Sequence, residues 1–200
     1  GAIRAESLSQ LIDLARVFTT QPLPQGNRLG IITTSGSLGA LSTDFAVSSG
    51  LTVPPLSSWM VNRARERSPE WMNVKNPLDI GPSGIYSQLL PMLLADPEID
   101  MVLAIMVIPW EAVRNFKTAG FSVRDWFGDV AAIRERFPHK PLVGVVVGHP
   151  EYVNEIASLG GRSIPIFTSP EAATQALASL WTYSRAREKS GNRRSDTGQR

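Results

Sequence analysis

The chain has 200 residues and no cysteine, which excludes disulfide bonds, thiolate zinc sites and cysteine nucleophiles. Its formal charge is +2, but residues 185–200 hold six basic and two acidic side chains, so the remainder is slightly acidic. This basic segment has no aromatic residue for base stacking, and its polar composition is typical of a disordered terminus. We therefore expect a disordered basic tail over residues 187–200 and no nucleic-acid partner.

The longest apolar stretch, residues 101–110, is half as long as the roughly 20 residues that a membrane helix needs. The first residues show no charged segment followed by an apolar one, so no signal peptide is readable. These two observations predict a cytoplasmic protein with no membrane partner.

The first predicted element is an amphipathic helix over residues 5–18, whose apolar side chains recur at three- and four-residue spacing. Ser7 is placed to cap its N-terminus. The Pro- and Gly-rich stretch 19–28 ends this helix and leads into the first strand. We expect residues 1–26 to form a helix and linker ahead of a domain that spans residues 27–186.

Beyond this helix, predicted strands alternate with predicted helices. Buried strands are expected at residues 29–33, 51–53, 101–108, 142–147 and 164–167. Helices are expected near residues 39–49, 59–67, 85–95, 123–137, 152–159 and 170–185. Two of the strands are continuously apolar, which is typical of burial on both faces of a parallel sheet. The pattern predicts a doubly wound α/β domain of the flavodoxin-like type, with five parallel strands in the order 2-1-3-4-5.

The last helix has a strong start signal. Ser169 is an expected N-cap, Pro170 suits the first turn and Glu171 suits the positive end of the helix dipole. We therefore expect the helix to begin at residue 170.

A run of mostly small residues follows the first strand: Ser35, Gly36, Ser37, Leu38 and Gly39. In an open α/β sheet, ligands bind beyond the carboxyl ends of the strands, next to the point where the strand order reverses. Small residues let the backbone approach a ligand closely, and the amides at the start of the following helix attract an anion. The run matches neither G-x-G-x-x-G nor a Walker loop. Anion binding and a plain strand-to-helix turn are both open interpretations.

A second loop of small residues, VKNPLDIGPSG at residues 74–84, also leads into a helix. Its candidate functional residues are Asn76, Asp79, Gly81, Ser83 and Gly84. Asp79 either orients the loop or forms an Asx-type turn near Pro77. Two helix N-termini at one edge of the sheet would point at the same anion from two directions.

Three segments in this order resemble one module of the NDP-forming acyl-CoA synthetases, the relatives of succinyl-CoA synthetase that include ADP-forming acetyl-CoA synthetase. They are AESLSQLIDLARVFTTQPLPQGNRLGIITTSGSLGAL, VKNPLDIGPSG and PIFTSPEAATQALASLWTYSR. The similarity extends over residues 2–187 and corresponds to the second flavodoxin-like CoA-ligase domain, the counterpart of the C-terminal domain of the succinyl-CoA synthetase β subunit. On this resemblance, residues 1–26 follow a preceding ligase domain.

The resemblance implies an activity that belongs to a longer enzyme. Such an enzyme interconverts acyl-CoA, phosphate and ADP with acid, CoA and ATP. It forms an acyl phosphate, transfers the phosphoryl group to a histidine and passes it to ADP on an ATP-grasp domain. Two power helices, one from each ligase domain, aim their N-termini at the phosphohistidine. In this chain the power-helix loop would be residues 35–39, with residues 76–84 as a supporting loop.

The resemblance also implies what lies outside this chain. The phosphorylated histidine of the family lies in the preceding domain, so we expect no catalytic residue here, and no metal ligands are spaced for a site. The implied partners are the CoA-binding/phosphohistidine ligase domain and the ATP-grasp domain, in the same longer chain or as separate subunits, with a homo-oligomer as a further expectation. CoA, ADP or ATP, phosphate and Mg serve the whole enzyme, and none is expected to bind this chain alone.

Two alternatives stay open. The loop TSGSLG has fewer glycines than the corresponding loop of many family members, and Leu38 replaces a small residue, so a non-catalytic binding or regulatory module with the ligase fold is the second hypothesis. A flavodoxin-like FMN binder is the third, although no pair of stacking aromatics accompanies the loop. His149, after the fourth predicted strand, is interpreted as a loop residue, a helix cap or a ligand contact.

Overall fold

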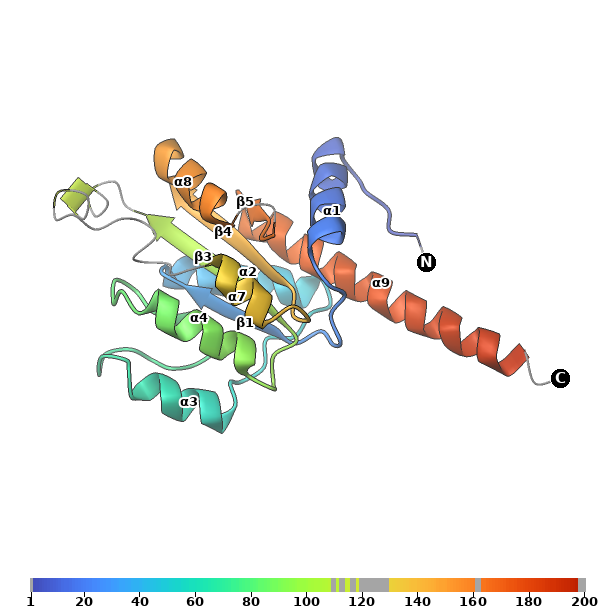
Figure 1. Cartoon of the computed structure of the whole chain (residues 1–200), viewed down its shortest axis with the longest axis horizontal. Helices are drawn as coiled ribbons and strands as arrows, with labels where there is room; N and C mark the ends of the chain where they lie inside the picture. Colours follow the sequence, from blue (N-terminus) through green and yellow to red (C-terminus); the bar gives the residue numbers. More distant parts are fainter. Residues whose placement is uncertain are drawn as a thin grey trace.

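The computed structural model describes residues 2–108, 111, 114–115, 118, 130–160 and 163–197, and a parallel sheet forms its centre. The strands are β1 (Leu29–Thr33), β2 (Leu78–Asp79), β3 (Met101–Ile108), β4 (Leu142–Gly148) and β5 (Ile166–Phe167). Every pairing is parallel, and the order is β2-β1-β3-β4-β5. The predicted flavodoxin-like order 2-1-3-4-5 is therefore confirmed (Figure 1).

Helices cover both faces of the sheet. They are α1 (Leu8–Thr20), α2 (Gly36–Ser48), α3 (Ser58–Arg65), α4 (Tyr86–Ala95), α7 (Val130–Arg136), α8 (Pro150–Gly160) and α9 (Pro170–Thr197). α1 and α2 pack with α9 on one face, whereas α4 and α8 contact the other, with α3 beside α4 and α7 beside α8. In Figure 1, α4 and α7 lie in front of the strands and α2 lies behind them. An apolar cluster on each face buries most of β3 and β4, as their continuous apolar runs predict.

Serine caps determine where α1 and α9 begin. Ser7 Oγ accepts a hydrogen bond from Gln10 N (3.1 Å), and Ser169 Oγ accepts one from Ala172 N (3.2 Å). Each cap satisfies one of the first backbone N–H groups of its helix, which have no partner within the helix itself. Both predicted caps are therefore confirmed, and so is the start of α9 at residue 170, whereas α1 begins at Leu8 and not at residue 5.

The end of α9 differs from the prediction. The helix has 28 residues and continues to Thr197, so the expected end near residue 185 is too early. Arg, Ala, Glu and Lys follow that point, and all four residue types have a high helix propensity. Figure 1 shows the C-terminal part of α9 extending past the sheet. The division of the chain at residues 26 and 186 stays a proposal.

Of the expected helix over residues 123–137, α7 accounts for Val130–Arg136, and residues 123–129 lie outside the described part of the chain. Within the described ranges, no helix combines the length and the apolar character that crossing a membrane requires.

The predicted strand at residues 51–53 is wrong. Thr52 makes only an isolated parallel bridge with Arg28, and Pro54 and Pro55 follow almost at once. Proline has no backbone N–H to donate to a ladder, so the pairing stops there. Further along β1, the same edge is paired by β2 instead.

The side chain of Asn76 fills the gap in this edge between Thr52 and β2. Its Oδ1 accepts a hydrogen bond from Ile31 N (2.9 Å). Its Nδ2 donates to Leu29 O (2.8 Å) and to Pro54 O (2.9 Å). The carboxamide thus makes the bonds to β1 that a peptide unit of a neighbouring strand would make. Asn76, a candidate binding residue in the sequence analysis, has its polar atoms directed into the sheet.

Gln21 bridges the opposite part of the sheet in a similar way. Its Oε1 accepts a hydrogen bond from Leu142 N (2.9 Å) at the start of β4. Its Nε2 donates to Ser163 O (2.7 Å), shortly before β5. The residue is 7% exposed, so the end of α1 is joined to the sheet through a buried amide.

Replacing Gln21 with alanine is expected to lower the free energy of unfolding by about 1.5 kcal/mol, because the Leu142 N–H loses its acceptor inside the protein. Urea unfolding of the chain measures this change. Gln10→Ala is the matched control, since Gln10 lies on α1, the helix that Gln21 follows, and its Oε1 accepts one hydrogen bond in an exposed setting. An equal loss in the two variants would contradict the bridging role.

Candidate functional site

The candidate site lies at the carboxyl ends of β1 and β3. All strands run in parallel, so these ends share one edge of the sheet, and the strand order reverses between them. Thr34 joins the two ends, because its Oγ1 accepts a hydrogen bond from Val107 N (2.8 Å) and donates one to Val107 O (3.3 Å). α2 begins directly after this threonine and Ser35, so its N-terminus is held at the same edge.

The N-terminus of α2 has no side-chain cap. Ser35 is the N-cap residue, but its Oγ lies 3.1 Å from Ser37 Oγ and bonds no backbone N–H of the helix. Among the described residues, no acceptor contacts the N–H groups of Gly36, Ser37 and Leu38. Gly36 and Ser37 are also exposed. Three backbone donors are therefore unused at the positive end of the helix dipole.

Thr33 holds the backbone of Ser35 in place. The buried Thr33 hydroxyl accepts a hydrogen bond from Ser35 N (2.9 Å) and donates one to Ser35 O (2.9 Å). The roles of Thr33 and Thr34 were not predicted from the sequence. Two adjacent threonines at the end of a strand are a sequence signal for such a role, because threonine hydroxyl groups often form hydrogen bonds with nearby backbone groups. Both residues position the loop.

Gly39 has a packing role. It is buried, and a Cβ added there would lie 3.0 Å from Thr33 Cγ2 and 3.2 Å from Pro77 Cβ. Glycine therefore lets the first turn of α2 lie close to β1 and to the segment before β2. The Leu38 side chain is partly buried against the apolar cluster of the same face. Within the predicted power-helix loop, Leu38 and Gly39 therefore serve packing. The three residues before them border the solvent.

The fold brings Asp79 to the start of α2. Its Oδ1 accepts a hydrogen bond from Gly81 N (3.0 Å), which is the geometry of the predicted Asx-type turn. Its Oδ2 lies 2.7 Å from the point where a Cβ on Gly36 would stand. This carboxylate interacts favourably with the helix dipole but adds negative charge beside the unused amides. The two predicted loops are thus joined through Asp79.

The rest of the supporting loop leads into α4. Gly81 and Gly84 have φ angles of +47° and +72°, a region that favours glycine. Ser83 Oγ is buried and has no hydrogen-bond partner within the described residues. Ile85, the N-cap residue of α4, provides no side-chain cap. Burial raises the pKa of Tyr86, the first residue of α4, so its hydroxyl stays protonated.

Trp71 borders this loop and was not assigned a role from the sequence. Its ring lies 3.2 Å from the point where a Cβ on Gly81 would stand, and the residue is 61% exposed. Its exposed ring adds apolar surface beside the supporting loop. Trp71 lies in a loop, where no periodic pattern marks it, so only the structure places it against Gly81.

The other candidates for a chemical role are His149 and possible metal ligands. His149 Nδ1 lies 3.4 Å from Glu151 N at the start of α8, which corresponds to the helix-cap interpretation. No group of three or more His, Asp or Glu side chains in the described ranges is arranged to hold a metal ion. The site therefore offers backbone donors and one carboxylate for ligand binding.

Comparison with protein-family models finds no match. Among curated proteins, the chain is similar to the alpha subunit of ADP-forming acetate–CoA ligase II from Pyrococcus furiosus, with 31% identity over 186 residues. This match covers 90% of the present chain and 38% of that protein. The alpha subunit of ADP-forming acetate–CoA ligase I from the same organism is 28% identical over 192 residues, which is 94% of this chain and 40% of that protein.

A solved structure shows the same similarity. The dinucleotide-forming acetyl-coenzyme A synthetase 1 of Candidatus Korarchaeum cryptofilum, in complex with phosphate and ADP, is 25% identical and has a TM-score of 0.76. The match covers 92% of this chain and 39% of that chain, so the present chain spans about two fifths of the length of these relatives. The chain is therefore a homologue of one part of these longer ADP-forming CoA ligases.

Proposed function

We propose that this domain stabilises a phosphohistidine while its enzyme interconverts acyl-CoA, phosphate and ADP with acid, CoA and ATP. The observation that carries the proposal is the set of unused N–H donors of Gly36, Ser37 and Leu38 at the start of α2. A phosphoryl group spreads its negative charge over several oxygens, so preorganised donors stabilise it without covalent chemistry. The helix dipole favours the same anion.

The histidine would come from another part of the enzyme. The chain spans 38% of a relative named as the alpha subunit of an ADP-forming acetate–CoA ligase. In this proposal, the CoA-binding/phosphohistidine ligase domain and the ATP-grasp domain complete the enzyme, which uses CoA, ADP or ATP, phosphate and Mg. The relative solved with phosphate and ADP supports a reaction that involves these two compounds.

The supporting loop contributes mainly through its backbone. Asp79 orients the loop by accepting a hydrogen bond from Gly81 N, and Asn76 keeps β1 in place beside β2. The first turn of α4 also lacks a side-chain cap, and the positive end of its helix dipole favours an anion. The two uncapped helix starts would then act on the same phosphoryl group.

A non-catalytic binding module is the second candidate, and one observation favours it. Asp79 Oδ2 lies next to Gly36, so an anion that enters the loop meets a carboxylate and is repelled. Titration with inorganic phosphate, followed by amide NMR, separates the two candidates. Only the phosphohistidine role predicts shifts confined to residues 35–39 and 79–86.

Gly36→Pro tests the phosphohistidine role. Gly36 is the first residue of α2, and Ser35 before it is extended, with φ −142° and ψ 112°, a conformation that accepts a following proline. The substitution removes one backbone donor. It is expected to reduce histidine phosphorylation at least tenfold, an order-of-magnitude figure for the loss of one such donor, in the enzyme reconstituted with its CoA-binding and ATP-grasp partners.

Gly36→Ala is the matched control. Both substitutions place a Cβ beside the Asp79 carboxylate, but alanine keeps the N–H group that proline lacks. Circular dichroism checks that the two variants have the same helix content. Equal histidine phosphorylation in the two variants would contradict a role for the backbone donor.

A further inference from the structure

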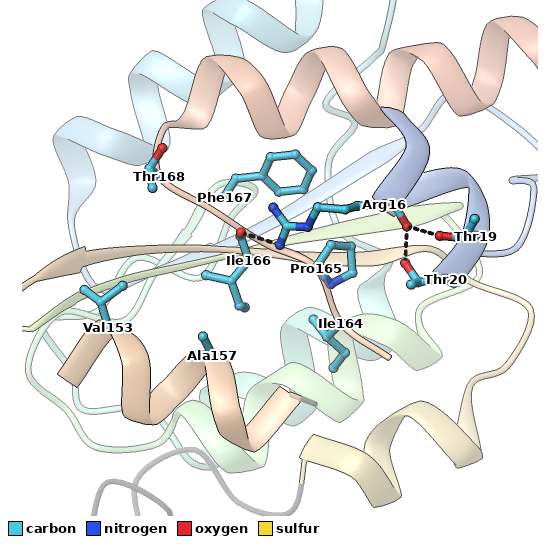
Figure 2. Close-up of a pocket in the computed structure, with 10 residues that line it drawn as sticks. All are labelled: Arg16, Thr19, Thr20, Val153, Ala157, Ile164, Pro165, Ile166, Phe167 and Thr168. Atoms are coloured by element: carbon cyan, nitrogen blue, oxygen red, sulfur yellow. Dashed lines mark hydrogen bonds between the residues drawn. The ribbon is translucent and has the colours of Figure 1, made fainter. Parts of the chain in front are cut away.

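The outer edge of β5 borders a groove of about 430 Å³ that the proposed function does not use. α1 and α8 form its two sides, and the segment around β5 lies between them (Figure 2). The lining is mainly apolar, with Val153 and Ala157 from α8 and Ile164 and Ile166 from the β5 segment. A groove of this volume, with apolar walls and few polar groups, is typical of small-molecule sites.

Arg16 of α1 is the charged residue of the groove. Its Nη2 donates a hydrogen bond to Ile166 O (3.0 Å), and its Nη1 lies 3.5 Å from Asp13 Oδ1. Its Cζ lies 5.6 Å from the centre of the Phe167 ring. Figure 2 shows the guanidinium between this ring and the Ile166 carbonyl. No other acceptor among the described residues contacts it, so several of its five N–H donors are unused.

Part of this arrangement protects the sheet edge. Gly144 pairs with Ile166 and donates its N–H to Pro165 O, so both main-chain groups of Ile166 point away from β4. Arg16 occupies the outward carbonyl and blocks it from pairing with another strand. That single hydrogen bond is sufficient for edge protection. Edge protection does not explain why the Arg16 side chain is held by three contacts beside an apolar groove. Nor does it explain why this side chain is 45% exposed.

We propose that the groove binds an amphipathic carboxylate, with its carboxylate on the Arg16 guanidinium and its aliphatic chain between α8 and the β5 segment. The planar fork of a guanidinium matches a carboxylate in both geometry and charge. The apolar walls favour the transfer of methylene groups out of water. The groove lies beside β5, which is an outermost strand of the sheet. α2 follows β1, which lies next to the outermost strand on the other side. The proposal is therefore independent of the phosphohistidine role.

Titration of the isotope-labelled chain with sodium octanoate, followed by amide NMR, tests this site. Saturable shifts are expected in the residues of α1, β5 and α8 that line the groove. 1-Octanol has the same chain without the charge, and it is expected to bind about tenfold more weakly because it lacks the charge-assisted hydrogen bonds. Hexanoate is expected to bind about fifteenfold more weakly because it buries two methylene groups fewer.

Two substitutions complete the test. Arg16→Gln is expected to weaken octanoate binding about tenfold, whereas Arg63→Gln is expected to leave it unchanged. Arg63 is the matched control, since it is also exposed and pairs with an acidic residue three positions away, Glu66, at 3.6 Å. Ala157→Phe fills the groove and keeps Arg16, so it is expected to abolish the octanoate shifts even where Arg16→Gln weakens the fold.

Four results would overturn the proposal: no saturable shifts with octanoate, equal affinity for octanoate and 1-octanol, unchanged affinity in Arg16→Gln, or octanoate shifts that persist in Ala157→Phe.

Discussion

Replacing Asn76 with alanine is expected to lower the free energy of unfolding by about 3 kcal/mol. The variant removes the acceptor of the Ile31 N–H and the amide that donates to Leu29 O. Both β1 residues are fully buried, so water has little access to the two main-chain groups. Each buried group left without a partner costs about 1–3 kcal/mol. Urea unfolding monitored by circular dichroism measures the loss.

Asn27→Ala is the matched control for this prediction. Asn27 Nδ2 also donates to a main-chain carbonyl, that of Gly50 (3.1 Å), but in an exposed setting where water replaces it. Its removal is expected to cost less than about 1 kcal/mol. Equal losses in Asn27→Ala and Asn76→Ala would contradict the strand-bridging role.

The second large effect is expected at the amino ends of the strands, where Arg28 pairs with Asp100. Asp100 Oδ2 accepts hydrogen bonds from Arg28 N (3.0 Å) and Nε (2.9 Å), and Oδ1 accepts one from Nη2 (2.9 Å). Burial raises the pKa of Asp100, but the hydrogen bonds and charge of Arg28 outweigh it and leave the pKa below its ordinary value. The hydrogen bond to Asp100 in turn raises the pKa of Arg28.

Asp100→Asn is expected to destabilise the chain by about 2 kcal/mol at neutral pH, since it removes charge-assisted hydrogen bonds from a buried position. The pKa of Asp100 is lower in the folded state than in the unfolded state, so its stabilising effect is present above the unfolded-state value of about 4. That effect is lost as the pH falls through the folded-state pKa. The stability difference between wild type and variant is therefore expected to shrink below about pH 4.

Urea unfolding over a pH series from neutral to acidic conditions measures this difference. Glu98→Gln is the matched control, because Glu98 pairs with the same Arg28 at 3.0 Å but has a side chain that is 53% exposed. Exposed ion pairs contribute little, so this variant is expected to lose less than about 0.5 kcal/mol. A difference between wild type and Asp100→Asn that stays constant with pH would contradict the assignment of the lowered pKa to this pair.

Features of the fold that depend on neighbouring residues were predicted well. Ser7 and Ser169 were identified as caps because a helix start involves positions two or three residues apart. The continuous apolar runs that became β3 and β4 identified the strands buried on both faces. From these strands and the alternating helices followed the order of the sheet.

The edges of the sheet were predicted poorly. The apolar residues 51–53 resemble a strand, but Pro54 and Pro55 end the pairing after one bridge. β2 has only two residues, which is too short for a periodic pattern. Asn76 provides the missing hydrogen bonds from a side chain, and its presence in the motif NPLD does not reveal that function.

The sequence by itself determined the central strands, the serine caps of α1 and α9, and the run of mostly small residues after β1, because apolar periodicity and capping act over a few positions. Only the tertiary structure decided which backbone N–H groups of that run have no hydrogen-bond acceptor. It packed Gly39 against Pro77 and brought the Asp79 carboxylate beside Gly36. These contacts form only when segments far apart in the sequence pack together, so local sequence patterns do not predict them.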